Sequence, residues 1–185
     1  MMEYSNTTIR KMKDSDLWRV YEWRNHPSVR KGMFNSHVIS KSSHEKWFEK
    51  LKNDKNCCLL LIQNNKQPFG FTQLSYLACR TIVDWGFYVA PNSTRGLGNI
   101  LGQRVLEYCF NDLGLHKICG QVLSFNTKSI NLHLRLGFQK EGILRNQHLI
   151  DNSYYDIYEF GIMNNEWKMK NEKNDIFFVP RKDEL

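Results

Sequence analysis

The fold is decided by residues 86–100, GFYVAPNSTRGLGNI, which join a predicted strand to a predicted helix. The strand ends near Val89, a turn containing Pro91 follows, and an Arg-Gly-x-Gly run that begins at Arg95 opens a long amphipathic helix. Glycines let the backbone approach a ligand closely, and unpaired amides at the start of a helix attract a phosphate or pyrophosphate. The stretch therefore predicts an anion site. Because the Arg-Gly-x-Gly run has only two glycines, a glycine-rich turn without a ligand is the alternative.

Two common nucleotide-binding motifs do not fit this stretch. A Rossmann motif needs a third glycine and an early parallel βαβ unit, whereas this run lies in the middle of the chain after antiparallel strands. A Walker loop needs Gly-Lys followed by Ser or Thr, and the sequence has no such triplet. We therefore expect a different fold around the anion site.

The segments before the motif predict two helices and an antiparallel meander. One helix is expected from a cap at Asp14 or Ser15 to Asn25, and a polar loop leads to a second helix capped by Ser42 or Ser43. Compact or alternating apolar runs predict strands at 7–12, 57–62, 68–76 and 81–89.

The segments after the motif predict β-α units and a closing hairpin. Apolar residues at helical spacing indicate a long helix at 97–113 and a short one at 129–136, with Gly137 as its C-cap. Strands are expected at 117–123, from Phe138 onward, and at 144–150 and 154–162, the last two joined by a turn over Asp151 and Asn152.

These elements predict a fold of the α/β (α+β) class, with a single mixed, mostly antiparallel central sheet flanked by helices. The chain has 185 residues, of which 41% are hydrophobic and 24% charged, as expected of one packed domain. We expect the domain to span residues 1–168 and a polar, loosely attached tail to span residues 169–185.

The net charge of +7 at pH 7 is compatible with a nucleic-acid partner or with a phosphorylated small ligand. Lys and Arg are scattered and often adjoin acidic residues, so they form no basic arm. No run approaches the roughly 18 apolar residues of a membrane helix, and the first residues lack the apolar core of a signal peptide. We therefore expect a cytoplasmic protein without nucleic-acid or membrane partners, and we interpret the C-terminal Lys182-Asp183-Glu184-Leu185 as coincidental.

The cysteine and acidic residues follow no pattern typical of a disulfide framework or a metal site. The five cysteines are odd in number and contain no Cys-x-x-Cys, which argues against a disulfide framework and a zinc ribbon. The stretch from His148 to Asp156 matches no zinc or EF-hand spacing, and turns collect Asp and Asn for conformational reasons. We expect reduced cysteines and no metal.

A second stretch, residues 126–145, has the sequence NTKSINLHLRLGFQKEGILR. With the first stretch it resembles the GNAT superfamily of acetyl-CoA-dependent N-acetyltransferases, whose pattern is Arg/Gln-x-x-Gly-x-Gly/Ala and, further on, Asn-x-x-Ser/Ala and Leu-Gly-Phe-x-x-Glu-Gly. Ile100 departs from this pattern at a position usually occupied by Gly or Ala, but its backbone amide is retained. The resemblance, over residues 85–145, implies the GNAT (acyl-CoA N-acyltransferase) fold, with acetyl-CoA as co-substrate.

The resemblance also implies which residues hold acetyl-CoA. They belong to the end of the strand, to the glycine-containing turn and to the start of the second motif. The predicted residues are Phe87, Tyr88, Val89, Arg95, Gly96, Leu97, Gly98, Asn99, Ile100, Asn126 and Ser129.

Both ends of the chain resemble one subgroup of that superfamily. WRNHPSVR at 23–30 and the segments at 39–48 and 154–167 are similar to PseH-type enzymes, which acetylate the 4-amino group of a UDP-linked 4-amino-4,6-dideoxy sugar on the route to pseudaminic acid. From chemistry alone, guanidinium groups suit a diphosphate and an aromatic ring suits a nucleoside base, although Arg24 also suits a helix C-terminus. The predicted acceptor residues are Arg24, Arg30, Met33, Phe34, His44 and Trp47.

Acetyl transfer to an amine requires a base, a donor to the thioester oxygen and a proton for the leaving thiolate. Many GNAT enzymes use a tyrosine four residues before Gly-Phe as the acid, and here His133 holds that position, with a surface histidine as the alternative. A backbone amide near the end of the strand at 86–89 is expected to bind the oxyanion. Gln73, Asp84 and His44 are candidates for holding a water that acts as the base, and His44 equally suits a structural role.

Three functions compete at this point. They are a nucleotide-sugar N-acetyltransferase, an N-acetyltransferase of protein N-termini (ribosomal-protein type) or of a small amine such as an aminoglycoside, and a basic nucleic-acid-binding module. A peptide amine or a polycationic antibiotic favours an acidic site, whereas this chain is basic. The expected partners are acetyl-CoA and a nucleotide-linked amino sugar, and a homodimer is left open as the assembly.

Overall fold

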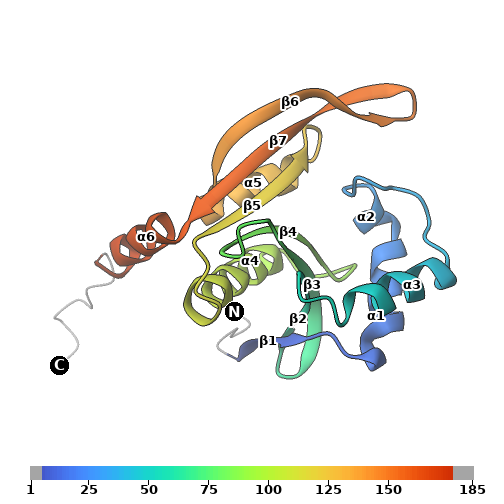
Figure 1. Ribbon diagram of the computed structural model, residues 1–185, viewed down its shortest axis with the longest axis horizontal. Coiled ribbons are helices and arrows are strands. Elements are labelled where there is room, and N and C mark those ends of the chain that lie inside the picture. Colours follow the sequence, from blue (N-terminus) through green and yellow to red (C-terminus); the bar gives the residue numbers. More distant parts are fainter. Residues whose placement is uncertain (1–5, 177–185) are drawn as a thin grey trace.

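A computed structural model describes residues 6–176, which contain a seven-stranded sheet in the order β1-β2-β3-β4-β5-β7-β6 (Figure 1). Neighbouring strands are antiparallel except β4 and β5, which are parallel. The predicted mixed, mostly antiparallel sheet is therefore confirmed. The strands are β1 (Thr7–Lys11), β2 (Cys57–Asn64), β3 (Gln67–Tyr76), β4 (Ile82–Val89), β5 (Lys117–Leu123), β6 (Gln139–Ile150) and β7 (Ser153–Met163).

Helices cover both faces of the sheet because side chains alternate between the faces along each strand. Phe71 and Tyr88 pack on the face covered by the first and third helices, whereas Leu74 and Trp85 pack on the face covered by the fourth and fifth. The helices are α1 (Leu17–Asn25), α2 (Pro27–Arg30), α3 (Lys41–Leu51), α4 (Leu97–Glu107), α5 (Thr127–Leu136) and α6 (Asn164–Ile176).

The N-terminal helices differ from the prediction in two details. Pro27 begins the short helix α2 inside the predicted polar loop, since proline at the first helical position sacrifices no hydrogen bond. Helix α3 begins earlier than predicted, because its N-cap is Ser40 rather than Ser42 or Ser43. The Oγ atom of Ser40 accepts a hydrogen bond from the backbone amide of Ser43 at 3.1 Å.

Helices α4 and α5 lie in close contact because α4 has a glycine where they meet. A Cβ atom on Gly102 would lie 2.4 Å from Cδ1 of Leu136, so a larger residue does not fit without movement. Helix α4 continues into a π-helical turn, Tyr108–Asp112, which completes the predicted helix at 97–113. Helix α5 ends at Gly137 with φ of +103°, and the predicted C-cap is confirmed.

The last two strands form a long hairpin that projects from the body of the sheet (Figure 1). The segments predicted from Phe138 onward and at 144–150 form one strand, β6, with an irregularity between Leu144 and His148. Helix α6 follows β7 and crosses residue 168, so residues 169–176 are helical, and the boundary between domain and tail stays a prediction. The sequence Lys182–Leu185 lies outside the described residues. Within residues 6–176, no helix is long and apolar enough to cross a membrane.

Candidate active site

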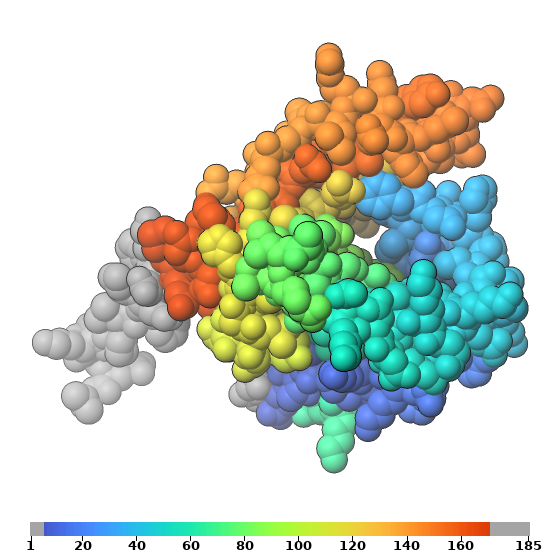
Figure 2. All heavy atoms as spheres, in the orientation of Figure 1, coloured from blue at the N-terminus to red at the C-terminus, as the bar shows by residue number. Residues whose placement is uncertain are grey.

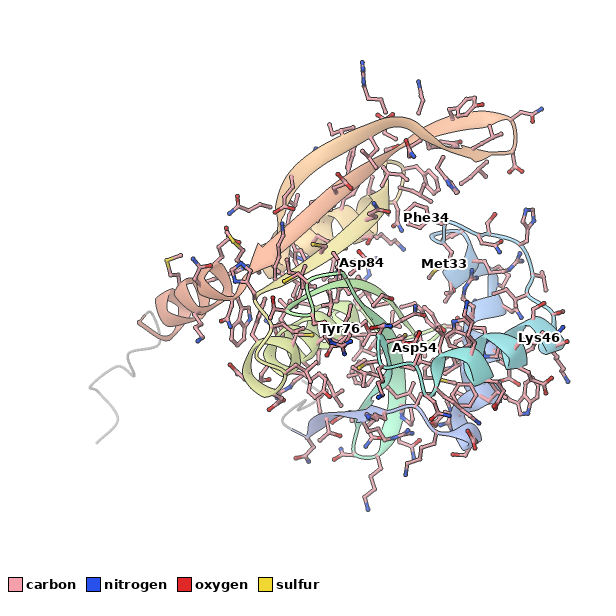
Figure 3. The ribbon with its side chains drawn as sticks, in the orientation of Figure 1. Met33, Phe34, Lys46, Asp54, Tyr76 and Asp84 are labelled. Carbon is pink, nitrogen blue, oxygen red and sulfur yellow. The ribbon has the colours of Figure 1, made fainter. Side chains whose placement is uncertain are left out.

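A pocket of about 490 Å³ opens on the sheet face that carries α1 and α3, between these helices and strands β3 and β4. Figure 2 shows the surface hollowed beside the segment that follows α2. In Figure 3, Met33 and Asp84 lie on opposite sides of this hollow, and Lys46 lies on the outer side of α3. The lining residues are Arg24, Met33, Asn35, Ile39, Ser43, His44, Trp47, Phe71, Gln73, Ser75, Asp84, Gly86, Phe87 and Tyr88.

Arg24 forms one end of the pocket and is incompletely paired. Its Nη2 atom donates to the backbone oxygen of Asn35 at 2.6 Å, while its Nη1 atom is buried and has no hydrogen-bond partner. Burial lowers the pKa of Arg24, partly opposed by nearby Tyr88. A buried guanidinium nitrogen without an acceptor is costly, so this end of the pocket suits an anionic group.

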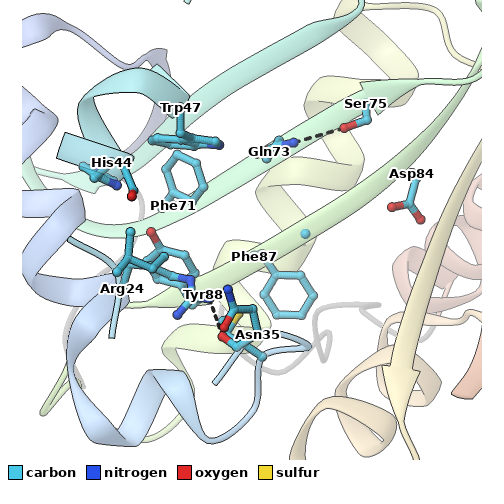
Figure 4. A pocket seen from close by; sticks show the side chains of 14 residues that line it. Arg24, Asn35, His44, Trp47, Phe71, Gln73, Ser75, Asp84, Phe87 and Tyr88 are labelled. Atoms are coloured by element: carbon cyan, nitrogen blue, oxygen red, sulfur yellow. Dashed lines mark hydrogen bonds between the residues drawn. The ribbon is translucent and has the colours of Figure 1, made fainter. Parts of the chain in front are cut away.

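Asp84 forms the opposite end of the pocket (Figure 4). It pairs with Ser75 across the β3–β4 ladder, and the Oγ atom of Ser75 accepts a hydrogen bond from Nε2 of Gln73 at 3.2 Å. Burial raises the pKa of Asp84 to about 6. Near neutral pH this carboxylate is ionised yet basic enough to accept a proton, which is the property of a general base.

Aromatic side chains form the wall beside Arg24. His44 stacks on Trp47 with ring centroids 4.8 Å apart and is 3% exposed. Its Nε2 atom donates to the backbone oxygen of Leu17 at 3.1 Å, and burial lowers its pKa. Because this nitrogen is occupied by a backbone contact, His44 contributes a neutral apolar surface to the pocket.

A notch opens between β4 and β5. Their parallel pairing begins at Ile82 and ends at the pair of Asp84 with Cys119, after which the strands separate. The amide of Ala90 donates to the backbone oxygen of Phe69 on β3. Since adjacent residues of a strand point their amides to opposite sides, the amides of Phe87 and Val89 face the notch. The notch therefore offers backbone donors to an oxyanion, as the sequence predicts for this strand end.

The glycine-containing turn lies at the start of α4. Gly96 has φ of +97°, a left-handed conformation that other residues adopt only with strain. The amides of Asn99 and Ile100 donate to the backbone oxygen of Gly96, so the amides of Leu97 and Gly98 precede the first intrahelical bond. Amides that precede the first intrahelical bond fit a pyrophosphate, and the Ile100 side chain packs against the core.

Tyr88 lies elsewhere than the sequence predicts. Its side chain lines the pocket on the same face as Arg24, and by alternation its backbone points toward β3 rather than into the notch. Burial raises the pKa of its phenol. Tyr88 is therefore a pocket residue, and its contact with acetyl-CoA stays a prediction.

His133 is neither on the surface nor in the pocket. It is 2% exposed and lies in the core between Trp85, Phe138 and Phe160. Its Nδ1 atom donates to the backbone oxygen of Ser129 at 2.8 Å, and its Nε2 atom accepts a hydrogen bond from the Trp85 indole at 3.1 Å. Burial lowers its pKa to about 4. The proton of this neutral ring is on Nδ1 and is bonded to the backbone, and the ring does not line the pocket, so this geometry argues against a general acid here and that role stays a prediction.

The second motif connects the pocket to the far half of the molecule. The Oδ1 atom of Asn126 accepts the amide of Ser129 and caps α5, while its Nδ2 atom donates to the backbone oxygen of Gly32 at 3.3 Å. The backbone amide of Ser129 donates to Asn126, and the backbone oxygen of Ser129 accepts the hydrogen bond from His133. Neither residue lines the pocket, which leaves their role toward acetyl-CoA a prediction.

The predicted acceptor residues divide into two groups. Four of them line the pocket: Arg24, Met33, His44 and Trp47. Arg30 instead holds the segment after α2, through its Nη1 atom and the backbone oxygen of Ser36 at 2.9 Å, and Phe34 is 39% exposed outside the pocket. Ile39 and Ser43 belong to the resembling segment 39–48, and Gly86 belongs to the stretch 86–100, but none of them was assigned to the site. The sequence predictions also missed Asn35, Phe71 and Ser75, which carry no motif of their own.

A family model described as the Acetyltransferase (GNAT) domain matches residues 6–139, most of the chain. The chain belongs to the GNAT acetyltransferase family. This GNAT protein is therefore an enzyme that uses acetyl-CoA as co-substrate, and the notch and the turn before α4 fit that ligand. Among residues 6–176, no cluster of His, Cys, Asp and Glu is suited to hold a metal ion.

Individual relatives are distant. The acetyltransferase PseH of Campylobacter jejuni subsp. jejuni serotype O:23/36 is 25% identical over 136 residues, 72% of this chain and 82% of that protein. Spermidine N(1)-acetyltransferase of Vibrio cholerae serotype O1 is 24% identical over 173 residues, 91% of this chain and 99% of that protein. The crystal structure of spermidine N-acetyltransferase from Vibrio cholerae in complex with CoA and spermine has a TM-score of 0.81 at 23% identity, covering 89% of this chain and 99% of that one. This structural likeness confirms the GNAT fold.

Proposed function

We propose that this GNAT acetyltransferase transfers the acetyl group of acetyl-CoA to the 4-amino group of a UDP-linked 4-amino-4,6-dideoxy sugar, as its sequence resemblance implies. The observation that carries the proposal is that Arg24 lines the pocket while its buried Nη1 atom has no hydrogen-bond partner. A diphosphate oxygen would complete its hydrogen bonding and compensate its charge. The homologous PseH of Campylobacter jejuni supports the choice of acceptor, and a homodimer stays a prediction.

The two ends of the pocket suit a molecule with an anionic group and an amine at different places. Arg24 and Asp84 lie at opposite ends, with apolar surfaces of Trp47 and Phe87 between them (Figure 4). A sugar ring packs well against aromatic surfaces, and the amine would then face the carboxylate. In this proposal the phosphates bind at Arg24 and the reacting nitrogen faces Asp84.

The proposed chemistry is direct transfer. The amine nitrogen attacks the thioester carbon, the new C–N bond forms, and the C–S bond breaks. Asp84, directly or through a water held near Gln73, takes the proton from the amine. An amide of Phe87 or Val89 donates to the carbonyl oxygen as negative charge develops there. The thiolate takes its proton from water, since a thiol has a pKa of about 8.5 and its anion is a tolerable leaving group.

A polyamine is the second candidate, because the spermidine N(1)-acetyltransferase of Vibrio cholerae aligns with 91% of this chain. The lining of the pocket argues against it. A polyamine carries several ammonium groups, and among the lining residues it would meet one carboxylate, Asp84, and the buried guanidinium of Arg24. Like charges at short range cost several kcal/mol when desolvated, so the pocket disfavours such an acceptor.

The decisive experiment measures thiol release from acetyl-CoA with a panel of acceptors. We expect kcat/KM for the UDP-linked 4-amino sugar to exceed that for spermidine by at least about 100-fold, a difference of roughly 3 kcal/mol. An aminoglycoside and a peptide with a free N-terminus complete the panel. Preference for spermidine, or for either of these amines, would overturn the proposed acceptor and leave the acetyltransferase assignment intact.

A further inference from the structure

The segment that follows α2 closes one side of the pocket and is held by side chains from α1 and α2. We call residues 31–40 the acceptor strap, since Met33, Asn35 and Ile39 line the pocket. The side chain of Asn25 binds Ile39 twice, accepting its amide at 2.8 Å and donating to its backbone oxygen at 2.9 Å. Arg24 donates a hydrogen bond to the backbone oxygen of Asn35, and Arg30 donates one to the backbone oxygen of Ser36. These contacts fix one side of the strap to the N-terminal half.

The other side of the strap is held by residues from the far half of the chain. The Nδ2 atom of Asn126 donates to the backbone oxygen of Gly32 at 3.3 Å, and the Nε2 atom of His148 donates to that of Phe34 at 2.8 Å. The rings of His148 and Phe34 also meet edge to face, with centroids 5.3 Å apart. In Figure 1 the strap faces the free end of the β6–β7 hairpin. His148 belongs to strand β6 of that hairpin.

Asn126 makes two contacts with two different consequences. Its oxygen caps α5, and its nitrogen holds the strap. The contact is tight, because a Cβ atom on Gly32 would lie 2.9 Å from that nitrogen. Helix α5 packs closely on α4, whose N-terminal turn fits the pyrophosphate of acetyl-CoA. The strap is therefore connected through Asn126 to the half of the molecule that carries the cofactor turn.

We propose that Asn126 and His148 are positioning residues for the acceptor: they hold the strap along one side of the pocket and make its order depend on the half that binds acetyl-CoA. The inference rests on the proposed function only in taking the pocket as the acceptor site. Neither side chain lines the pocket, so both act through the strap. Binding of acetyl-CoA beside α4 and α5 then orders the strap before the acceptor enters.

The test uses substitutions that remove the donor and keep the rest of the side chain. Asn126→Asp keeps an oxygen to cap α5 and loses the Nδ2 donor to Gly32. His148→Phe keeps an aromatic edge against Phe34 and loses the donor. Matched controls on the same elements are the exposed residues Asn131→Asp on α5 and Gln147→Ala on β6.

Hydrogen exchange of the strap amides is the first readout, measured on the full chain without acceptor. We expect exchange of residues 31–40 to accelerate roughly 3- to 10-fold in Asn126→Asp and His148→Phe and not in the controls, as expected for loss of one hydrogen bond. Saturating acetyl-CoA should slow this exchange in the wild type. In Asn126→Asp, acetyl-CoA should no longer slow it. Unchanged strap exchange in both variants would overturn the inference, whatever the acceptor is.

Steady-state kinetics with the acceptor that the wild type prefers is the second readout. His148→Phe should raise KM for the acceptor roughly 3- to 10-fold and change kcat and KM for acetyl-CoA less than 2-fold. If the wild type does not acetylate the UDP-linked sugar but strap exchange still accelerates in the variants, the proposed acceptor fails and the positioning role stands. A loss in kcat alone, with KM for the acceptor unchanged, would contradict the positioning role.

Discussion

The indole nitrogen of Trp85 donates a hydrogen bond to Nε2 of His133 at 3.1 Å, across 48 positions of sequence. The other ring nitrogen, Nδ1, donates to the backbone oxygen of Ser129, so the histidine is neutral with its proton on Nδ1. This pairing satisfies a buried Trp and a buried His at once, and it fixes α5 against β4. At the position where the resemblance predicts a general acid, this chain has a core hydrogen bond.

Replacement of His133 should therefore affect stability more than chemistry. His133→Ala removes a fully buried ring and leaves the Trp85 donor without a partner, so unfolding in urea should show a loss of about 2–4 kcal/mol. For the folded enzyme, kcat should stay within about threefold of the wild type. The exposed His116→Ala serves as the control. A 100-fold loss of kcat with unchanged stability would restore His133 as the acid.

Acid should destabilise the protein partly through the same residue. The folded-state pKa of His133 is about 4, below the ordinary value of 6.5, so its contribution to stability is complete above pH 6.5 and is lost as the pH falls toward 4. We expect the fall in unfolding free energy between pH 7 and pH 4 to be smaller in His133→Ala than in the wild type. Denaturant melts at several pH values measure this, and parallel curves for the two proteins would show that His133 does not titrate in this range.

Asp84 should control the pH dependence of the reaction. Its pKa of about 6 predicts that kcat/KM rises with pH up to about 6 and then levels off, because only the ionised carboxylate accepts a proton. Asp84→Asn should lower kcat/KM roughly 10²–10³-fold and remove this limb of the profile. The exposed Asp112→Asn is the matched control. An unchanged limb in Asp84→Asn would assign the base elsewhere.

The melting temperature of Asp84→Asn shows whether a loss of activity comes from the lost base or from a damaged fold. Burial raises the pKa of Asp84 from 3.8 to about 6. The contribution of this raised pKa to the free energy of unfolding is therefore complete below about pH 3.8 and is lost as the pH rises through about 6. At pH 8 the ionised carboxylate opposes folding, and its removal should therefore raise the melting temperature. A variant that is less active yet more stable at pH 8 is the expected combination.

Gly98 should decide whether acetyl-CoA stabilises the protein. The wild type should melt at a higher temperature with acetyl-CoA, because a ligand that binds the native state stabilises it by mass action. Gly98→Glu should abolish this shift, since a carboxylate would stand beside the amides that fit the pyrophosphate. Gly98→Ala is the control: its Cβ atom would meet only Leu132 at 3.6 Å, an ordinary contact. A normal shift in Gly98→Glu would place the pyrophosphate elsewhere.

Local patterns predicted most elements of the fold. The strand at Lys117–Leu123 and the end of α5 at Gly137 agree with the sequence prediction, because alternation and a glycine C-cap are local signals. Helix α6 was missed since its polar composition gives no apolar face to detect. Ser40 was missed as a cap because three serines lie close together and only the backbone decides among them.

Residues of the site could be predicted only where they belong to a recognisable sequence motif. The turn before α4 follows from its glycines, and Arg24 follows from the resemblance, but the burial of His133 depends on Trp85, Phe138 and Phe160, which meet only in the folded sheet. The face on which Tyr88 lies is likewise fixed by the β3–β4 register, which a one-residue shift would reverse. These are tertiary relationships that no single stretch of sequence encodes.

In the proposed function, the buried, unpaired nitrogen of Arg24 selects an acceptor with an anionic group. The most direct measurement compares kcat/KM for the UDP-linked 4-amino sugar with that for the same amino sugar without the nucleotide, in the wild type, in Arg24→Gln and in the outward-facing control Lys46→Ala. We predict that the ratio of the two kcat/KM values is at least about 100 in the wild type and in Lys46→Ala. In Arg24→Gln this ratio should fall to less than about fivefold, while KM for acetyl-CoA stays nearly unchanged. A ratio that is the same in Arg24→Gln as in the wild type would contradict the account.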